Sequence, residues 1–514
     1  MTGPAQQDAG ASRSGRPLAL GVLCTLLFLT FLDSTIVSVA LGNVQSSLHA
    51  DVADLQWVVC AYTLTFASIM LACGMIGDEL GRKKVMLTGA AVFCAGSVLC
   101  ATAPNVQLLI AGRAVMGLGA AASEPGTLSM LRQLYPDDKA RTRAIGVWAA
   151  TSGFALAAGP LIGGVLVGAW SWRGIFWFNL AFGLAALIVA ARVLPESADP
   201  SAARVDTAGT LLGAGALATL VFAIIDAETA GFSSVVVIVL LCVSVLLLAA
   251  FAWWERRVAH PLLDLRYLRV AAFTTGNIAA FCTYFATFAI FFFTALYLVE
   301  VAGASGYRLA AVFLPMTALM VISSLLAGRW TAWAGPRWSI AIGCVLFAIG
   351  LLLSNNYLNP DPSYVPLALS LCVAGIGIGT TVVPITSAVM SAVPAERSGM
   401  AASAANTSRV IGAAAGVAVL GSLVNSQLRV SLTGQMDHLR IPLGFQNLVV
   451  NALETGQIPR NTAEYAAFGK LVQEVIGAAY QAFHDGLHAA LYLSAGLAVF
   501  AGLLAVFTLR GRTS

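Results

Sequence analysis

Two opposite charges lie inside a long apolar stretch of the chain. Residues 105–131 are mostly apolar, yet they contain Arg113 and Glu124. In an α-helix the eleven steps between them turn through about 1100°, so both side chains leave the same face, about 16 Å apart along the axis. An ionised side chain at the centre of a bilayer costs on the order of 2.5–3.5 kcal/mol, so it is expected to face a partner or a cavity. The pair therefore predicts a helix that lines an aqueous path.

A third charge lies in the first apolar stretch, residues 17–41, which contains Asp33. Asp33 is about 24 Å from the cytoplasmic start of its helix, and Arg113 is about 27 Å from the cytoplasmic end of its own. Their similar depths predict an intramembrane pair. A neighbouring cation favours the carboxylate and desolvation favours the acid, so we expect proton occupancy to change with conformation. A permanent ion pair that only fixes helix packing is the alternative.

Other polar residues in apolar stretches are candidates for substrate binding. Glu124 lies about 10 Å deep and has no charged residue beside it in the sequence. We expect it to bind a cationic substrate or to carry a second proton; a carboxylate satisfied by nearby hydroxyls is the alternative. Asn406 and Arg409 are the strong polar pair of the second half. Arg409 has three open interpretations: it counters a carboxylate, binds an anionic group, or snorkels to the interface.

Aromatic residues gather in residues 282–298, where Tyr284 and Phe288 are candidates to line an apolar cavity. Packing against neighbouring helices or lipid is the simpler interpretation. We expect no metal or other cofactor. The nine cysteines fall in apolar stretches without a C-x-x-C pair. His484 and His488 are spaced i, i+4 but have no further ligand nearby, which favours two interfacial histidines over a metal site.

The composition places these residues in a membrane protein. Hydrophobic residues make up 59% of the 514 residues, charged residues 10%, and the mean hydropathy is +0.85. Soluble chains carry about 25% charged residues. Apolar stretches of about 18 residues or more, each long enough to span a bilayer, recur along the chain. We predict fourteen spans: 17–41, 55–76, 85–103, 105–131, 143–168, 172–194, 207–226, 233–254, 271–299, 308–331, 338–355, 365–392, 397–427 and 486–510.

The loop charges orient these spans. About 20 of the 28 lysines and arginines fall on the side that holds both termini, which the positive-inside rule assigns to the cytoplasm. The net charge of +4 is therefore a topology signal. A nucleic-acid partner would need a contiguous basic face, and none is visible. Residues 428–485 mix polar and apolar types and predict an external loop, partly structured at most.

The loop between the second and third spans carries a specific pattern, G-x-x-x-D-x-x-G-R, made by Gly74, Asp78, Gly81 and Arg82 and followed by Lys83 and a second lysine. It resembles the loop signature of the major facilitator superfamily. The resemblance implies a charged latch that holds the cytoplasmic side shut and breaks as the two halves of the protein rock. A positive-inside signal alone is the alternative interpretation.

Further motifs agree with this family. LDSTIVSVALGNV at 32–44 resembles the first-span motif of the fourteen-span drug:proton antiporters, with departures at Ser38 and Gly42. WRGIFWFN, which ends in Asn179, resembles the start of the sixth span. The fifth-span motif regarded as a mark of antiporters is resembled by Gly153, Gly159, Pro160, Gly163 and Gly164. Close packing by small residues explains much of this glycine pattern without any further role.

The predicted fold is an all-α integral membrane protein with the major facilitator fold. A cytoplasmic tail (1–16) precedes a six-helix bundle (17–194), a linker with two extra transmembrane helices (195–270), a second six-helix bundle (271–510) and a short cytoplasmic tail (511–514). The resemblance implies a monomeric proton-coupled antiporter in the plasma membrane that exports amphipathic, often cationic drugs or antiseptics.

Two other functions remain open from the sequence. The first is a dedicated exporter with the same fold, which moves one endogenous metabolite, antibiotic or lipid. An integral membrane enzyme would need a cluster of catalytic His, Asp or Glu at one interface, and the loops lack one. None of the four lysines lies in a G-x-x-x-x-G-K-[ST] phosphate-binding pattern. The sequence therefore does not predict an ATPase.

Overall fold

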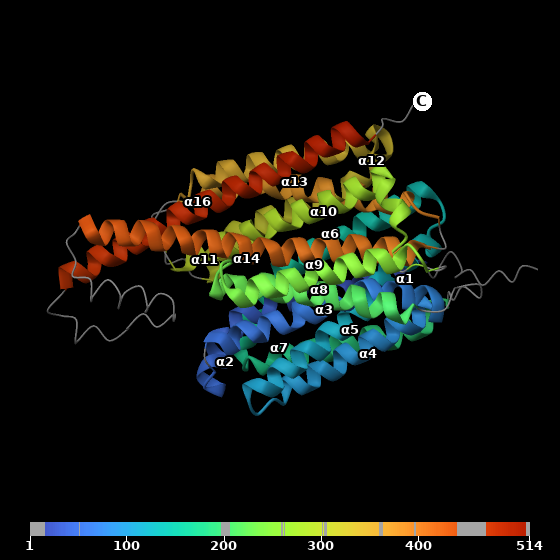
Figure 1. Ribbon diagram of the computed structural model, residues 1–514, viewed down its shortest axis with the longest axis horizontal. Coiled ribbons are helices and arrows are strands. Elements are labelled where there is room, and N and C mark those ends of the chain that lie inside the picture. Colours follow the sequence, from blue (N-terminus) through green and yellow to red (C-terminus); the bar gives the residue numbers. More distant parts are fainter. Residues whose placement is uncertain are drawn as a thin grey trace, which may run out of the picture.

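The computed structural model describes residues 16–50, 52–196, 206–258, 261, 263–300, 302, 306–358, 363–394, 397–438 and 469–509. Every regular element in these ranges is helical, and the helices run roughly alongside one another (Figure 1). The predicted cytoplasmic tails lie outside the described residues, apart from Arg16, which begins the first helix. An all-α protein was predicted, and the described part of the chain confirms it.

The N-terminal half holds helices α1 to α7. Their bounds are α1 (Arg16–Ile36), the 3₁₀ turn η1 (Val37–Ala40), α2 (Leu41–Leu48), α3 (Val52–Leu80), α4 (Arg82–Ala101), α5 (Val106–Leu134), α6 (Asp138–Ala169) and α7 (Arg173–Val193). Polar caps set several starts: the side chains of Asn105 and Asp137 accept hydrogen bonds from backbone N–H groups in the first turns of α5 and α6. Gly81, with φ 106°, makes the sharp turn between α3 and α4.

The C-terminal half holds α10 (Ala271–Phe288), a π-helical segment η3 (Ala289–Thr294), α11 (Ala295–Glu300), α12 (Gly306–Asn355), α13 (Tyr364–Ser391), α14 (Ser398–His438) and α16 (Gly469–Thr508). The 50-residue α12 contains one residue with non-helical angles, Gly335, at φ 77° and ψ 166°. Pro336 follows it, and this break lies between the predicted spans 308–331 and 338–355.

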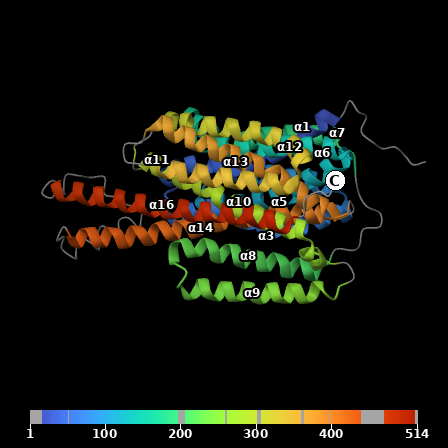
Figure 2. The ribbon, with the colours of Figure 1, turned by 90° about the horizontal axis from the view of Figure 1, so that it is seen from above.

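Two further helices, α8 (Thr207–Ala230) and α9 (Val235–Glu255), connect the halves together with the short turn η2 (Leu265–Arg269). They lie along one edge of the molecule (Figure 2). Helix α8 packs against both α3 and α14, and the Trp57 and Phe222 rings meet with centroids 5.2 Å apart. Helix α9 is mostly exposed and very apolar, as expected for a surface that faces lipid. The pair therefore lies along a seam where the two halves meet.

Eleven helices in the described residues are long and apolar enough to cross a membrane. The number is twelve if the bent pair Trp57–Met70 and Ala72–Leu80, with its 50° bend, counts as one span. This count treats Ala311–Asn355 as a single helix. A multi-span membrane protein is thus supported, with eleven or twelve such helices against the fourteen predicted.

The last long helices reach further than the sequence indicated. Helix α14 continues to His438 and α16 begins at Gly469, so both ends of the predicted loop 428–485 are helical. Both helices project beyond the rest of the bundle (Figures 1 and 2). Gly434 is exposed, and a Cβ atom there would meet nothing within 4 Å, so this glycine does not mark a tight turn. The middle of the predicted loop, residues 439–468, lies outside the described residues.

Candidate functional site

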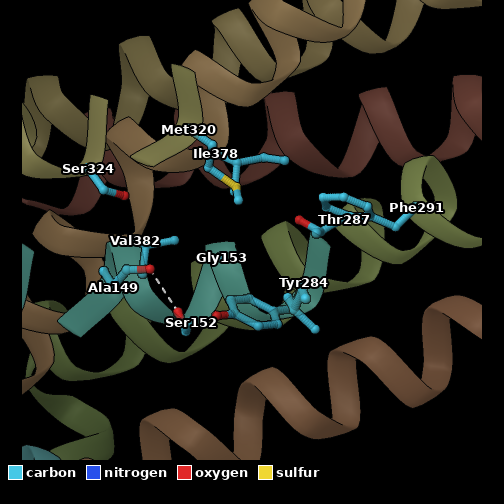
Figure 3. A pocket seen from close by; sticks show the side chains of 11 residues that line it. Ala149, Ser152, Gly153, Tyr284, Thr287, Phe291, Met320, Ser324, Ile378 and Val382 are labelled. Atoms are coloured by element: carbon cyan, nitrogen blue, oxygen red, sulfur yellow. Dashed lines mark hydrogen bonds between the residues drawn. The ribbon is translucent and has the colours of Figure 1, made fainter. Parts of the chain in front are cut away.

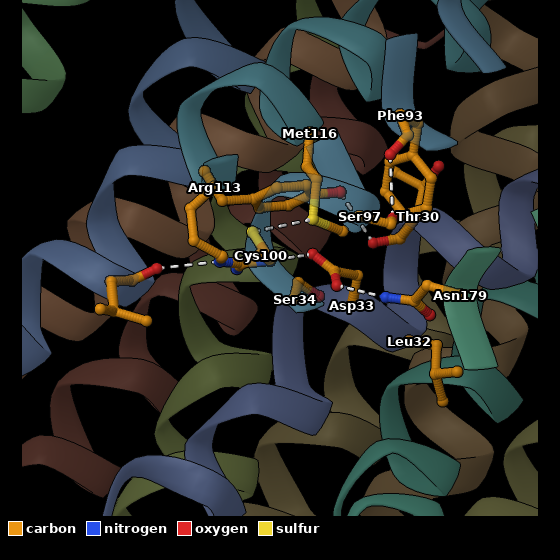
Figure 4. Close-up of polar contacts among 12 residues, drawn as sticks. Thr30, Leu32, Asp33, Ser34, Phe93, Ser97, Cys100, Arg113, Met116 and Asn179 are labelled. Carbon is orange, nitrogen blue, oxygen red and sulfur yellow. Dashed lines mark hydrogen bonds and ion pairs between the residues drawn. The ribbon is translucent and has the colours of Figure 1, made fainter. Parts of the chain in front are cut away.

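Asp33 of α1 and Arg113 of α5 lie together in the core of the N-terminal half, as their depths predicted (Figure 4). The side chains are 0% and 1% exposed. Arg113 Nη1 donates to Asp33 Oδ2, and Arg113 Nε donates to the backbone oxygen of Val58 at 2.9 Å. A buried charge is tolerated only when it is paired and hydrogen-bonded, and this pair meets both conditions.

Two further residues complete this cluster, and neither was predicted to belong to it. Asn179 Nδ2 donates to Asp33 Oδ1 at 2.7 Å (Figure 4), so both carboxylate oxygens have a donor. The Arg113 guanidinium lies over the Tyr62 ring, 4.6 Å from its centroid, and Tyr62 donates its hydroxyl to the backbone of Thr30 at 3.0 Å. The sequence could have indicated Asn179, because it is a polar residue inside an apolar span. No comparable feature of the sequence indicated Tyr62.

Glu124 lies in α5, eleven residues after Arg113, and is 1% exposed. Neither carboxylate oxygen has a hydrogen-bond partner within the described part of the chain. Nearby hydroxyls therefore do not satisfy it, contrary to the inert alternative. Thr127 instead donates to the Glu124 backbone oxygen at 2.7 Å and accepts from Trp148 Nε1 at 3.0 Å. The cation that attracts this carboxylate electrostatically is Arg409, from the other half.

Arg409 of α14 is 1% exposed and held from several sides. Its Nη1 donates to Asn406 Oδ1 at 2.7 Å, and its Nη2 donates to the Thr386 hydroxyl. The guanidinium lies 5.2 Å from the Trp148 ring of α6 and 5.6 Å from the Tyr284 ring of α10. Arg409 therefore does not snorkel. It points to the contact between the two halves, where the Nδ2 atom of Asn406 is buried without a partner among the described residues.

A cavity with an empty volume of about 320 Å³ lies beside this cluster, between the halves (Figure 3). Helix α6 supplies Ser152 and Gly153, α10 supplies Tyr284, and η3 supplies Phe291. The remaining lining residues are Ala149, Leu156, Thr287, Met320, Ser324, Ile378 and Val382. Tyr284 thus lies where a cavity residue was expected. Phe288 is half-buried and is not among the lining residues, whereas Phe291, one turn further on, is.

The loop motif connects the two halves at one end of the bundle. Asp78 pairs with Arg82 at 2.8 Å, and its carboxylate also lies against Gly399 in the first turn of α14. The positive end of a helix dipole favours such a carboxylate. Gly74 permits the close approach of α3 and α14, because a Cβ atom there would lie 2.8 Å from the Gly399 oxygen.

Two further loop residues take other positions. Gly81 supplies the positive φ of the turn, and Lys83 lies half-buried in the first turn of α4. The motif thus brings an acid, a cation and Gly74 to one contact between the halves, whereas Gly81 shapes the turn.

The glycines of the fifth-span motif divide between two contacts. On α6, a Cβ atom at Gly159 would lie 3.0 Å from the Ile36 nitrogen, and one at Gly163 would lie 2.8 Å from the Ile36 oxygen, so both permit close packing on α1. Gly153 faces Met320 of α12 in the other half. Gly164 is exposed, and a Cβ atom there would meet nothing within 4 Å. Pro160 follows Gly159 in the same helix.

Comparison with known proteins agrees with this geometry. The family model described as Major Facilitator Superfamily matches residues 23–417. The multidrug resistance protein Stp of Mycobacterium tuberculosis is 33% identical, over 91% of this chain and 87% of its own. The methylenomycin A resistance protein of Bacillus subtilis is 37% identical, over 79% and 86%. The tetracenomycin C resistance and export protein of Streptomyces glaucescens is 29% identical, over 99% and 94%.

The fold comparison gives the same result. The crystal structure of the human organic anion transporter MFSD10 superposes with a TM-score of 0.61 over 95% of this chain and 97% of that one, at 15% sequence identity. An identity this low shows a shared fold only. Together with the family match over most of the chain, it establishes that this protein belongs to the Major Facilitator Superfamily of membrane transporters.

Proposed function

We propose that the protein is a proton-coupled antiporter that exports amphipathic, often cationic drugs or antiseptics by alternating access. Several relatives carry names of multidrug or antibiotic resistance proteins. The observation that carries the proposal is Glu124, a buried carboxylate without a hydrogen-bond partner in the described residues, placed in the N-terminal half and attracted by Arg409 of the C-terminal half. The electrostatic environment of a carboxylate in that position changes whenever one half moves against the other.

The proton step is assigned to Asp33 and Arg113. Both carboxylate oxygens are hydrogen-bonded, to Arg113 and to Asn179, and these bonds favour the ionised form, whereas burial favours the protonated form. A conformational change that shifts α1 against α5 weakens these bonds and favours protonation, whereas entry of water favours the ionised form. Arg113 keeps the Val58 oxygen and the Tyr62 ring as partners while the proton is bound. The pair thus takes up a proton in one state and releases it in the other.

The substrate step is assigned to the cluster between the halves. A cationic group and a proton compete for the Glu124 carboxylate, and this competition is what exchange requires. The rings of Trp148 and Tyr284, with Phe291 along the cavity wall, offer apolar and π surface to the rest of the molecule. Asn406 and Arg409 supply donors at the far side. In the arrangement seen here the cavity has room for little more than a water molecule, as expected for a closed state.

We propose fourteen spans with both termini in the cytoplasm, in a monomer in the plasma membrane. Two spans join the twelve that pass by length and composition when the 32-residue α6 is counted and α12 is divided at Gly335. Two six-helix bundles (17–194 and 271–510) then flank the linker helices in 195–270. The basic side of the loops supports the orientation.

Transport into inverted membrane vesicles, with an imposed pH gradient and a panel of cationic and neutral dyes, tests this function. We expect cationic dyes to accumulate when the vesicle interior is acidic, and accumulation to stop when an ionophore collapses the gradient. Equal dye accumulation with and without the pH gradient would refute proton coupling. Vesicles from cells without the protein are the control for passive dye partitioning.

A dedicated exporter of one endogenous metabolite, antibiotic or lipid is the second candidate. Two relatives named for single antibiotics, methylenomycin A and tetracenomycin C, favour it. The same panel separates the candidates, because a dedicated exporter leaves all the dyes outside while the pH gradient persists. An enzyme is not favoured, since the family consists of transporters.

A further inference from the structure

A cation from the N-terminal half reaches the end of a helix in the C-terminal half. Arg132 lies in the last turn of α5. Its Nη1 donates to the backbone oxygens of Met390 at 2.8 Å and Pro394 at 3.4 Å, and its Nη2 donates to the Val393 oxygen at 3.0 Å. These carbonyls belong to the C-terminal end of α13 and the turn after it, where the last carbonyls of a helix have no partners within it and the dipole is negative.

The opposite end of the same turn meets an acid. Helix α14 begins at Ser398, and the Asp78 carboxylate of α3 lies against its first turn, where a Cβ atom on Gly399 would clash with Asp78 Oδ2. The negative end of α13 thus receives a guanidinium and the positive end of α14 receives a carboxylate. Both charged residues come from the N-terminal half, and both helix ends belong to the C-terminal half.

The turn itself is tied to the C-terminal half. Arg397, directly before α14, pairs with the largely buried Asp264 at 2.7 Å. Asp264 caps η2, the turn that leads into α10. The α13–α14 turn is therefore expected to move with its own half when the halves separate, which breaks the contacts to Asp78 and Arg132 and leaves the pair with Asp264 intact.

We infer that Arg132 is a second cytoplasmic clamp, which acts with Asp78 to hold the α13–α14 turn and so stabilises the state closed to the cytoplasm. This inference rests on the alternating access of the proposed function. Arg132 is a positioning residue, because it acts through the α13–α14 turn and is not among the residues that line the cavity. Its role follows from three bonds that cross between the halves at the point where they must part.

The chemistry of arginine explains why this residue type is present. A guanidinium offers five N–H donors in a planar fork and therefore serves several carbonyls at once. A lysine at the same position keeps the charge and its attraction to the helix end but cannot reproduce the forked geometry. A glutamine keeps a donor and loses the charge. The order of clamp strength is therefore arginine, then lysine, then glutamine.

The test measures opening of the cytoplasmic side directly. Spin labels are attached to Lys139→Cys in α6 of the N-terminal half and to Arg269→Cys in η2, the turn that leads into α10; both residues are exposed and neither is part of the clamp. Cys60 and Cys242 are replaced by serine, which leaves the seven buried native cysteines. Double electron–electron resonance then gives the distance distribution in the purified full-length protein, reconstituted in lipid nanodiscs at one fixed pH.

We expect Arg132→Gln to raise the ratio of long to short distances about tenfold, the ratio given by losing ~1.4 kcal/mol of charge-assisted hydrogen bonding. Asp78→Asn shifts the ratio in the same direction, and Arg132→Lys shifts it less than Arg132→Gln. Arg143→Gln, the same change at an exposed arginine of α6, is the matched control and leaves the distribution unchanged.

An unchanged distribution in folded Arg132→Gln protein would overturn the inference. If that variant does not fold, Arg132→Lys decides, and a distribution equal to the parent's overturns it. Dye transport in vesicles is a separate readout. A parent protein that moves no dye contradicts the proposed function and leaves the distance result standing, so the two failures are distinguishable.

Discussion

Replacing Asp33 with asparagine perturbs the proposed proton site with almost no change in size. The substitution leaves the guanidinium of Arg113, 1% exposed, without its counter-ion. Removing one partner of a buried ion pair costs about 3–5 kcal/mol, because the remaining charge stays in a medium that solvates it poorly. Asn179 adds a smaller loss, since its 2.7 Å bond to the carboxylate becomes a bond to a neutral amide.

A paired substitution separates the stability effect from the transport effect. Asp33→Asn combined with Arg113→Gln removes both charges, and replacing both members of a buried pair is often close to neutral. We therefore expect the double variant to recover most of the thermal stability that Asp33→Asn loses, measured on purified protein. Proton-driven transport should stay absent in both variants, because neither has a carboxylate to titrate at this position.

Inverted vesicles with an imposed pH gradient provide the transport assay. Ser34→Ala, directly beside the site, is the control, because it removes only a local bond from Ser34 Oγ to the Phe31 backbone oxygen. It should transport at the parent's rate. Proton-driven transport by Asp33→Asn at that same rate, from an equal amount of protein in the membrane, would refute the reasoning and favour a pair that only fixes helix packing.

Three further predictions concern other parts of the molecule. Glu124→Gln should lower accumulation of cationic dyes by about tenfold or more and that of neutral dyes much less, since a buried charge pair is worth at least about 1.4 kcal/mol; equal losses for both dye classes in the vesicle assay would count against a cation site. Gly163→Ala should lower thermal stability by forcing α6 away from the α1 backbone, whereas Gly164→Ala, whose Cβ position is open, should melt like the parent; equal melting temperatures would show that this packing is loose. Hydrogen bonding from Arg266 lowers the pKa of Asp264, so the stabilisation by the carboxylate is present above its unfolded pKa of about 3.9 and is lost as the pH falls through the lower folded value. Asp264→Asn should therefore melt earlier than the parent at neutral pH, with a difference that shrinks as the pH drops below about 4, and a gap that stays constant over that range contradicts the assignment.

The sequence was sufficient to predict the helical membrane architecture and the Asp33–Arg113 contact. Long apolar stretches dictate membrane helices by length alone, and depth along two helices follows from the rise per residue. The break at Gly335 was also anticipated, as the gap between spans 308–331 and 338–355. What the periodicity could not provide was the partner of the second carboxylate oxygen, because Asn179 is on a helix whose rotation about its axis no local pattern fixes.

The cluster between the halves could not be predicted from the sequence. Glu124 and Arg409 were each recognised as buried charges, yet their proximity depends on how two bundles dock, and no short-range pattern encodes that docking. Trp148 was missed because a tryptophan in an apolar span usually indicates packing. The extension of α14 and α16 was missed because their mixed polar residues resemble a loop when no buried face is known.

Proton movement during transport distinguishes proton-coupled exchange from export that does not involve protons. The purified protein is reconstituted in proteoliposomes that contain a pH-sensitive dye, and a transported cationic dye is added while a proton gradient is held across the membrane. We expect a proton flux that is opposite in direction to the dye, in fixed proportion to it and absent in the Asp33→Asn variant. Dye transport at the parent's full rate with no accompanying proton flux would contradict it.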